Sequence, residues 1–180
     1  MPEELKDEGQ SLKAFMLLHR VRDLLFKCQD RAVGEFGLTA EQYSVLLAVK
    51  YLDDPVRATD IGRWMERKVN SISMIVDRMV KAGLIERIRD LPDRREVRVV
   101  FTSKGKRAFE LATPEVWKLI EEMLSPLSHE EKRILIRLLE RLRDGALKHL
   151  NPGTDVRALA TYEAGDVSRL LKQMRRYTSQ

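Results

Sequence analysis

The chain has 180 residues, of which 43% are hydrophobic and 34% are charged, and its formal net charge is +5. This composition is that of an ordinary globular protein with one core and an appended element, and it excludes a low-complexity or fibrous chain. A single cysteine, Cys28, excludes an intramolecular disulfide. No apolar run reaches the roughly 20 residues that span a bilayer, and the polar start MPEELKDEGQ has no signal-peptide core, so we expect a cytoplasmic protein.

The positive charge gathers in one part of the chain. Between Arg57 and Arg107 there are fourteen basic and seven acidic residues, so this segment carries +7 and the remainder sums to −2. Such clustering is typical of a surface that binds a polyanion. A solvated face of mixed charge would give the same count, so the charge alone leaves both interpretations open.

The first half of the chain predicts two helices. Apolar residues recur at helical spacing over Leu12–Phe36, which indicates a long first helix that Gly37 ends. Thr39 and Gln42 have the spacing of a capping box and predict a second helix that runs to about Leu52.

Two further helices follow the chain break at Asp53–Pro55. The first is short and covers 60–66. The second has Asn70 as its predicted N-cap, ends at about Ala82, and has Gly83 as its C-cap. Its predicted buried face consists of Ile72, Ile75, Val76, Met79 and Val80.

The segment Leu84–Gly105 predicts a β-hairpin with a basic turn. Strand-forming residues flank the turn Pro92–Arg95 on both sides. Thr102 then caps a long helix that contains Pro114, and Ser128 begins another that runs to about Leu150. A further short helix is predicted over 166–177. The fold class is therefore mainly α with a small hairpin.

This order of elements resembles the MarR (multiple antibiotic resistance regulator) family of winged helix-turn-helix transcription factors. The resemblance rests on LTAEQYSVLLAV from Leu38, ATDIGRWMERKVNSISMIVDRMVKAGLIERI from Ala58, and DRREVRVVFTSKG from Asp93. It covers roughly Leu12–Leu150. The family's turn into the wing is matched by Asp77–Arg87.

The family's wing pattern is matched by Asp93, Arg95, Thr102 and Gly105, whereas Phe101 replaces the usual leucine. The resemblance implies a sequence-specific regulator of transcription, most simply a repressor, that binds double-stranded DNA. It also implies a fold in which the helix from Asn70 is the recognition helix and the hairpin is the wing.

Five residues of the recognition helix are predicted to contact DNA: Asn70, Ser71, Ser73, Met74 and Arg78. Such a helix lies in the major groove with its first residues at the base edges. Asn pairs with adenine, Ser serves bases or phosphates, and Met contacts a thymine methyl group, while Arg78 reaches phosphate. A solvated helix surface is the alternative for the serines.

Four residues of the wing are predicted to contact DNA. The resemblance implies that Arg95 enters the minor groove and that Asp93 orients its guanidinium, with Arg94 and Arg98 at phosphates. The alternative is a hairpin held by a surface Asp–Arg pair, which contributes less than about 1 kcal/mol.

The long terminal helices predict a homodimer on a pseudo-palindromic operator, because they carry more apolar surface than a small winged helix covers. The chain then divides into a dimerisation helix (1–36), a winged helix-turn-helix domain (37–105), further dimerisation helices (106–151) and an extension (152–180). The candidate interface residues are Leu12, Phe15, Met16, Leu135, Leu138, Leu139 and Leu142.

A ligand crevice is a further expectation. The resemblance implies that a small aromatic or phenolic anion, bound between the dimer helices and the winged helix, releases the protein from DNA. The candidate lining is Phe15, His19, Arg22 and Tyr43. The alternative places Phe15 and Tyr43 in the core and His19 at the surface.

No catalytic, metal or cofactor site is expected. The three histidines are scattered without metal spacing, and the chain has neither a Gly-rich phosphate loop nor a nucleophile elbow. We therefore expect no enzyme. The rival hypothesis is a winged-helix module that binds protein and no DNA.

Overall fold

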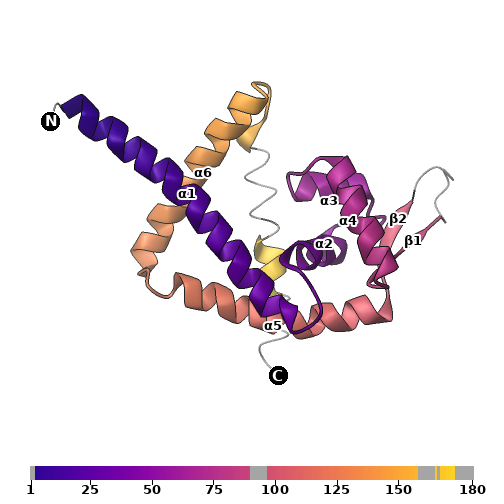
Figure 1. The fold of residues 1–180 in the computed structure, drawn as a ribbon. Coiled ribbons are helices and arrows are strands. Elements are labelled where there is room, and N and C mark those ends of the chain that lie inside the picture. The colour runs from indigo at the N-terminus through magenta and orange to yellow at the C-terminus, as the bar shows by residue number, and fades with distance from the viewer. Residues whose placement is uncertain (1–2, 90–96, 158–164, 166, 173–180) are drawn as a thin grey trace.

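The structure is a computed structural model that describes residues 3–89, 97–157, 165 and 167–172 (Figure 1). It confirms the expected mainly helical fold with one small hairpin. The elements in chain order are α1 (Glu3–Gly34), α2 (Ala40–Tyr51), α3 (Ala58–Trp64), α4 (Val69–Lys81), β1 (Ile85–Ile88), β2 (Arg98–Phe101), α5 (Ser103–Leu124) and α6 (His129–Leu150).

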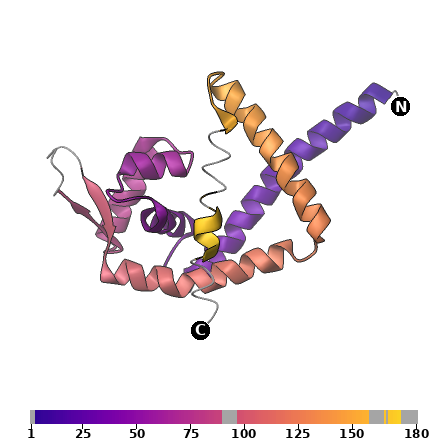
Figure 2. The ribbon, with the colours of Figure 1, turned by 180° about the vertical axis from the view of Figure 1, so that it is seen from behind.

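One core joins the winged helix to the end of α1. Helices α2, α3 and α4 gather beside the hairpin, and α5 runs along them and packs against α1 and α2 (Figures 1 and 2). Most of α1 and the whole of α6 project away from this body. The largest fully buried side chains are Tyr43, Phe109, Leu46, Ile61, Ile72, Met79 and Ile85.

The predicted hairpin is confirmed. Strands β1 and β2 pair antiparallel, with Ile85 opposite Phe101 and Ile88 opposite Arg98. The backbone amide of Val99 also donates to the carbonyl of Val56, 2.8 Å away. The segment before α3 therefore lies along the outer edge of β2 and ties the wing to the helices.

Two predicted capping boxes are confirmed. Thr39 accepts from the backbone of Gln42 at 3.2 Å, and the Gln42 side chain accepts from the backbone of Thr39 at 2.9 Å. Ser128 and Glu131 form the same reciprocal pair at the start of α6. The carboxylate of Glu131 has a lowered pKa because it accepts hydrogen bonds from the side chain and the backbone of Ser128.

The N-cap prediction for α4 is wrong. The helix begins at Val69 with Lys68 as its N-cap, so Asn70 lies within the first turn. The reason is the turn before it, in which Glu66 has a φ of +51° and the amide of Arg67 donates to the carbonyl of Gly62 at 2.8 Å. This turn places the start of the helix at Val69, one residue before Asn70, so Asn70 is already inside the helix.

The C-terminal end of α4 agrees with the prediction. Gly83 has a φ of +68°, and its amide donates to the carbonyl of Val80 at 2.9 Å. The amide of Leu84 donates to the carbonyl of Met79 at 3.0 Å, which completes a Schellman motif. Helix α4 therefore ends directly before β1.

Helix α1 is longer than predicted, because it begins at Glu3 rather than at Leu12. Residues 3–11 are mostly polar helix formers, and they extend the helix without contributing to an apolar stripe. The helix also ends at Gly34, before the predicted end at Phe36.

Gly105 explains how α5 meets the wing. A Cβ atom at this position would lie 1.8 Å from the carbonyl oxygen of Leu84, so no side chain fits. The hydroxyl of Thr102 donates to the same carbonyl oxygen of Leu84, at 3.0 Å. The first turn of α5 is thus held directly against the start of β1.

The extension is described only in part. Residues 167–172 are helical, and Leu170 packs against the core, while the predicted positions 166 and 173–177 lie outside the described residues. Within the described parts of the chain, no helix is long and apolar enough to cross a membrane.

Candidate nucleic-acid interface

Helix α4 presents a polar line opposite its apolar stripe. Ile72, Ile75, Val76 and Met79 are buried, which fixes the rotation of the helix about its axis. The opposite face carries the predicted recognition residues, of which Asn70, Met74 and Arg78 are exposed and Ser71 and Ser73 are half-buried.

The three exposed residues follow one another at four-residue spacing, so they lie along one side of α4. Met74 is 62% exposed, and the side chain of Arg78 is 68% exposed. Both extend into solvent from a helix whose backbone is anchored in the core. Asn70 lies at the N-terminal end of this exposed face, and a helix that enters a groove of DNA presents its first residues to the bases.

The turn between α3 and α4 adds two basic residues that the sequence reasoning missed. A Cβ atom on Gly62 would lie 3.1 Å from the carbonyl oxygen of Arg67, so the two helices approach closely there. Arg67 and Lys68 thereby stand at the N-terminal end of α4. The sequence signal that could have found them was their position directly before the helix predicted to contact DNA.

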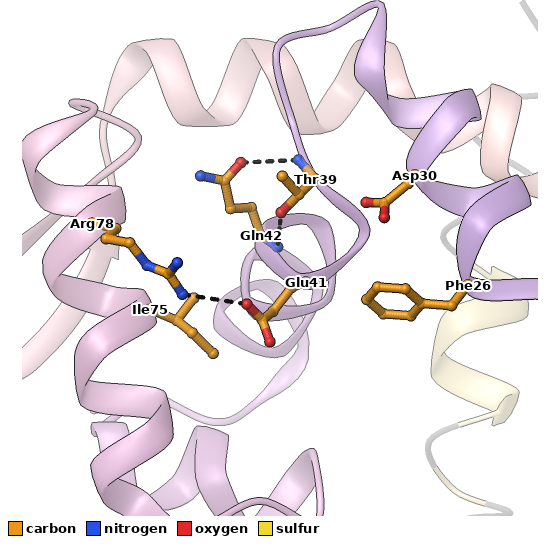
Figure 3. Close-up of a pocket in the computed structure, with 7 residues that line it drawn as sticks. All are labelled: Phe26, Asp30, Thr39, Glu41, Gln42, Ile75 and Arg78. Carbon is orange, nitrogen blue, oxygen red and sulfur yellow. Dashed lines mark hydrogen bonds and ion pairs between the residues drawn. The ribbon is translucent and has the colours of Figure 1, made fainter. Parts of the chain in front are cut away.

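Two ion pairs connect α4 to its neighbours. The carboxylate of Glu41, in the first turn of α2, pairs with Arg67 and lies 3.5 Å from a terminal nitrogen of Arg78 (Figure 3). Asp77 pairs with Arg87 of β1 and so links the recognition helix to the wing. Several charges of the basic segment are therefore partly neutralised within the protein.

Arg98 lies at the base of the wing. Its side chain is 23% exposed, and a terminal nitrogen lies 3.4 Å from the carboxylate of Asp54. This geometry favours a role in attaching the wing over the predicted phosphate contact. The other wing candidates, Asp93, Arg94 and Arg95, lie outside the described residues.

The four predicted ligand residues are not brought together within the chain. Tyr43 is 1% exposed, and its hydroxyl donates to the hydroxyl of Thr113 at 3.3 Å. Phe15 is 62% exposed on α1 and contacts the ring of His19. Arg22 is also exposed and pairs with the neighbouring Asp23. Tyr43 is thus a core residue, and the other three are on the surface of α1.

A different crevice lies between α1, α2 and α4. It measures about 280 Å³ and combines the apolar Phe26 and Ile75 with polar groups (Figure 3). Asp30, on one wall, accepts a hydrogen bond from the backbone of Ala40 at 2.6 Å. The full lining is Phe26, Asp30, Thr39, Glu41, Gln42, Ile75 and Arg78.

Comparison with known proteins relates the chain to one family. A family model described as "MarR family" matches residues 36–96, which contain α2, α3, α4 and β1. The chain is 26% identical over 152 residues to the transcriptional activatory protein BadR of Rhodopseudomonas palustris, covering 83% of this chain and 86% of BadR. Residues 36–96 therefore match the MarR family, and the relatives that align with most of the chain are named as transcriptional regulators.

Solved MarR-family structures share the fold. The organohalide-sensing regulator RdhR-CbdbA1625, bound to 2,4-dichlorophenol, superposes with a TM-score of 0.72 at 24% identity, covering 82% of this chain and 88% of that one. A mutant MarR from E. coli, in complex with operator DNA, gives a TM-score of 0.68 at 21% identity, covering 74% of this chain and 96% of that one. Both likenesses support the arrangement of α4 and the hairpin as helix and wing.

The Arg98 assignment can be tested by separating stability from DNA binding. Arg98→Ala is expected to lower the free energy of unfolding by up to about 1 kcal/mol, because it removes a largely buried guanidinium and its ion pair with the exposed Asp54, and Asp54→Asn should cause a smaller loss. Urea denaturation measures both. The salt dependence of DNA binding should not change. An unaltered stability with a salt slope flatter by about one would instead assign Arg98 to a phosphate.

Proposed function

We propose that this chain is a homodimeric MarR-family repressor that binds a pseudo-palindromic operator in duplex DNA. The observation that carries the proposal is the exposed line Asn70, Met74 and Arg78, held on a helix whose opposite face is buried. Such a regulator acts in the cytoplasm and needs neither catalysis nor a cofactor.

The proposed contacts follow from position along α4. Asn70 and Ser71 lie in the first turn, where side chains reach base edges, and an Asn side chain there suits adenine. Met74 suits the methyl group of thymine. Arg78, near the end of the helix, suits a backbone phosphate, and Ser73 suits a base or a phosphate.

The wing supplies the second proposed contact. We place Arg95 in the minor groove, with Asp93 pairing its guanidinium and Arg94 at a phosphate. The hairpin supports this role because its base is attached to the segment before α3 and, through Arg87, to the recognition helix. The two reading elements can therefore approach DNA as one unit.

Repression is the simpler outcome of operator binding. A dimer seated on a promoter excludes polymerase with no further contact, whereas activation needs an additional interaction. The relative BadR is named a transcriptional activatory protein. We therefore propose that the position of the operator in the promoter decides whether binding represses or activates transcription.

Removing the guanidinium of Arg95 tests the wing contact. Arg95→Ala should weaken binding to the promoter region upstream of the chain's own gene by about tenfold and flatten the salt slope by about one. Fluorescence anisotropy at several salt concentrations measures both quantities. Lys148→Ala, on exposed α6, removes the same charge and should change neither. Equal behaviour of the two variants would contradict the minor-groove role.

The homodimer is proposed from apolar surface that the single chain leaves uncovered. Helix α6 contains no buried residue, although its apolar residues recur at helical spacing. The middle of α1 is also exposed, and it was expected to be part of the interface. A second copy would cover both surfaces and place two recognition helices about one turn of DNA apart. Exposed residues that support this are Leu12, Phe15, Met16, Leu138, Leu139 and Leu142, with Leu135 half-buried beside them.

A charge placed in this interface should separate the copies. Leu138→Glu is expected to give a monomer at micromolar concentration, because a carboxylate would be buried without a partner. Sedimentation velocity measures the change in mass. Met74→Glu introduces the same group on α4, outside the proposed interface, and should remain dimeric. A monomeric wild-type chain would contradict the proposal directly.

Effector release is proposed from the crevice between α1, α2 and α4. The crevice holds two carboxylates, Asp30 and Glu41, and one guanidinium, Arg78, beside two apolar side chains. An anion would therefore meet net negative charge. A neutral phenol suits the crevice better than the aromatic or phenolic anion that the resemblance implied.

Matched ligands can distinguish the two classes. At slightly acidic pH, millimolar 2,4-dichlorophenol should raise the melting temperature and 2,4-dichlorobenzoate should not. Phe26→Ala should abolish the effect, whereas Phe15→Ala, which alters the originally predicted lining, should keep it. A shift with the benzoate alone would reverse the assignment.

The rival protein-binding module would be favoured if the chain retarded no DNA at any salt concentration.

A further inference from the structure

One carboxylate lies between two arginines on the DNA-facing side of the molecule. Glu41 pairs with Arg67, which precedes α4, and with Arg78, which lies near the end of α4 (Figure 3 draws the second pair). The two arginines are eleven positions apart in sequence, and Glu41 reaches them from α2.

The position of Glu41 is well defined. It lies in the first turn of α2, between the capping-box residues Thr39 and Gln42, where the helix dipole favours a negative charge. Its side chain is 26% exposed, and it forms part of the crevice wall. The carboxylate is therefore held beside α4 by the backbone of a different helix.

The two pairs differ in how easily they separate. Arg67 is fixed by its backbone bond to Gly62, and its side chain is the less exposed of the two. Arg78 makes a single contact with Glu41 at 3.5 Å, and most of its side chain is in water. A contact of that length and exposure is weak, so a phosphate can take Arg78 while Glu41 retains Arg67.

We infer that Glu41 is a positioning residue that holds Arg67 and Arg78 and so limits the positive charge that α4 and the turn before it offer to DNA. Non-specific binding is almost entirely electrostatic, whereas base contacts by Asn70 and Ser71 do not depend on this charge. A carboxylate that competes with phosphate for Arg67 and Arg78 therefore weakens the electrostatic part of DNA binding. This inference rests on the proposed DNA-binding function.

Glu41→Gln tests the inference. The probe is a labelled duplex of about 40 base pairs with mixed sequence, which reports non-specific binding. At about 0.1 M salt, the variant should bind this duplex about three- to tenfold more tightly, and its salt slope should steepen by about one. A merely structural role for Glu41 would not steepen the slope.

The matched control is Glu115→Gln. It makes the same charge change on an exposed position of α5, outside the cluster, and should leave the slope unchanged. In an Arg78→Gln background, Glu41→Gln should have a smaller effect, because one of its two partners is absent. If Glu41→Gln unfolds the chain, Glu41→Ser must give the same steepening.

The outcomes separate the two hypotheses. A folded Glu41 variant that binds the mixed duplex with wild-type affinity and slope would overturn the inference and leave the proposed function intact. An equal steepening of the salt slope by Glu115→Gln would also overturn the inference and leave the proposed function intact. A wild-type chain that binds no duplex at any salt concentration would overturn the proposed function, and the inference with it.

Discussion

The burial of one stripe of α4 is the constraint on which the rest of the molecule depends. Ile72, Ile75, Val76 and Met79 are removed from water by packing into the core. Burial of each such side chain contributes about 1.5–3 kcal/mol. Because these four residues share one face, their burial sets the rotation of α4 and directs Asn70 to solvent. The surface that we propose for DNA contact is thus a consequence of core packing.

The ion pairs around α4 act on a smaller energy scale. Exposed pairs contribute about 0–1 kcal/mol each, which is too little to orient a helix against the packing energy of its apolar face. Their larger effect is on charge. Glu41 and Asp77 each occupy guanidinium groups that a simple count of basic residues assigns to DNA. The count of fourteen basic residues between Arg57 and Arg107 therefore overstates how many of them are free to meet phosphate.

Local signals in the sequence were sufficient for most of the fold. The capping boxes at Thr39 and Ser128, the hairpin and the stripe of α4 depend on residues a few positions apart, and each was confirmed. The N-cap at Asn70 was wrong because the amide of Arg67 donates to the carbonyl of Gly62 and so closes the preceding turn earlier than the capping pattern indicated.

The candidate site was less predictable because it depends on contacts between distant parts of the chain. Glu41 lies 26 residues from Arg67 and 37 from Arg78, and no periodic pattern joins them. Tyr43 has the chemistry of a ligand contact, but its helix face turns it into the core beside Phe109. Pattern reasoning identified the right elements and assigned some of their side chains to the wrong surroundings.

The central claim is that packing holds α4 with its polar line outward for the major groove. A structure of the whole chain bound to duplex DNA from its own promoter region tests this most directly. The account predicts α4 in the major groove, with Asn70 at the base edges and Arg78 on a phosphate instead of Glu41. A complex in which α4 faces solvent while another surface meets the DNA would contradict it.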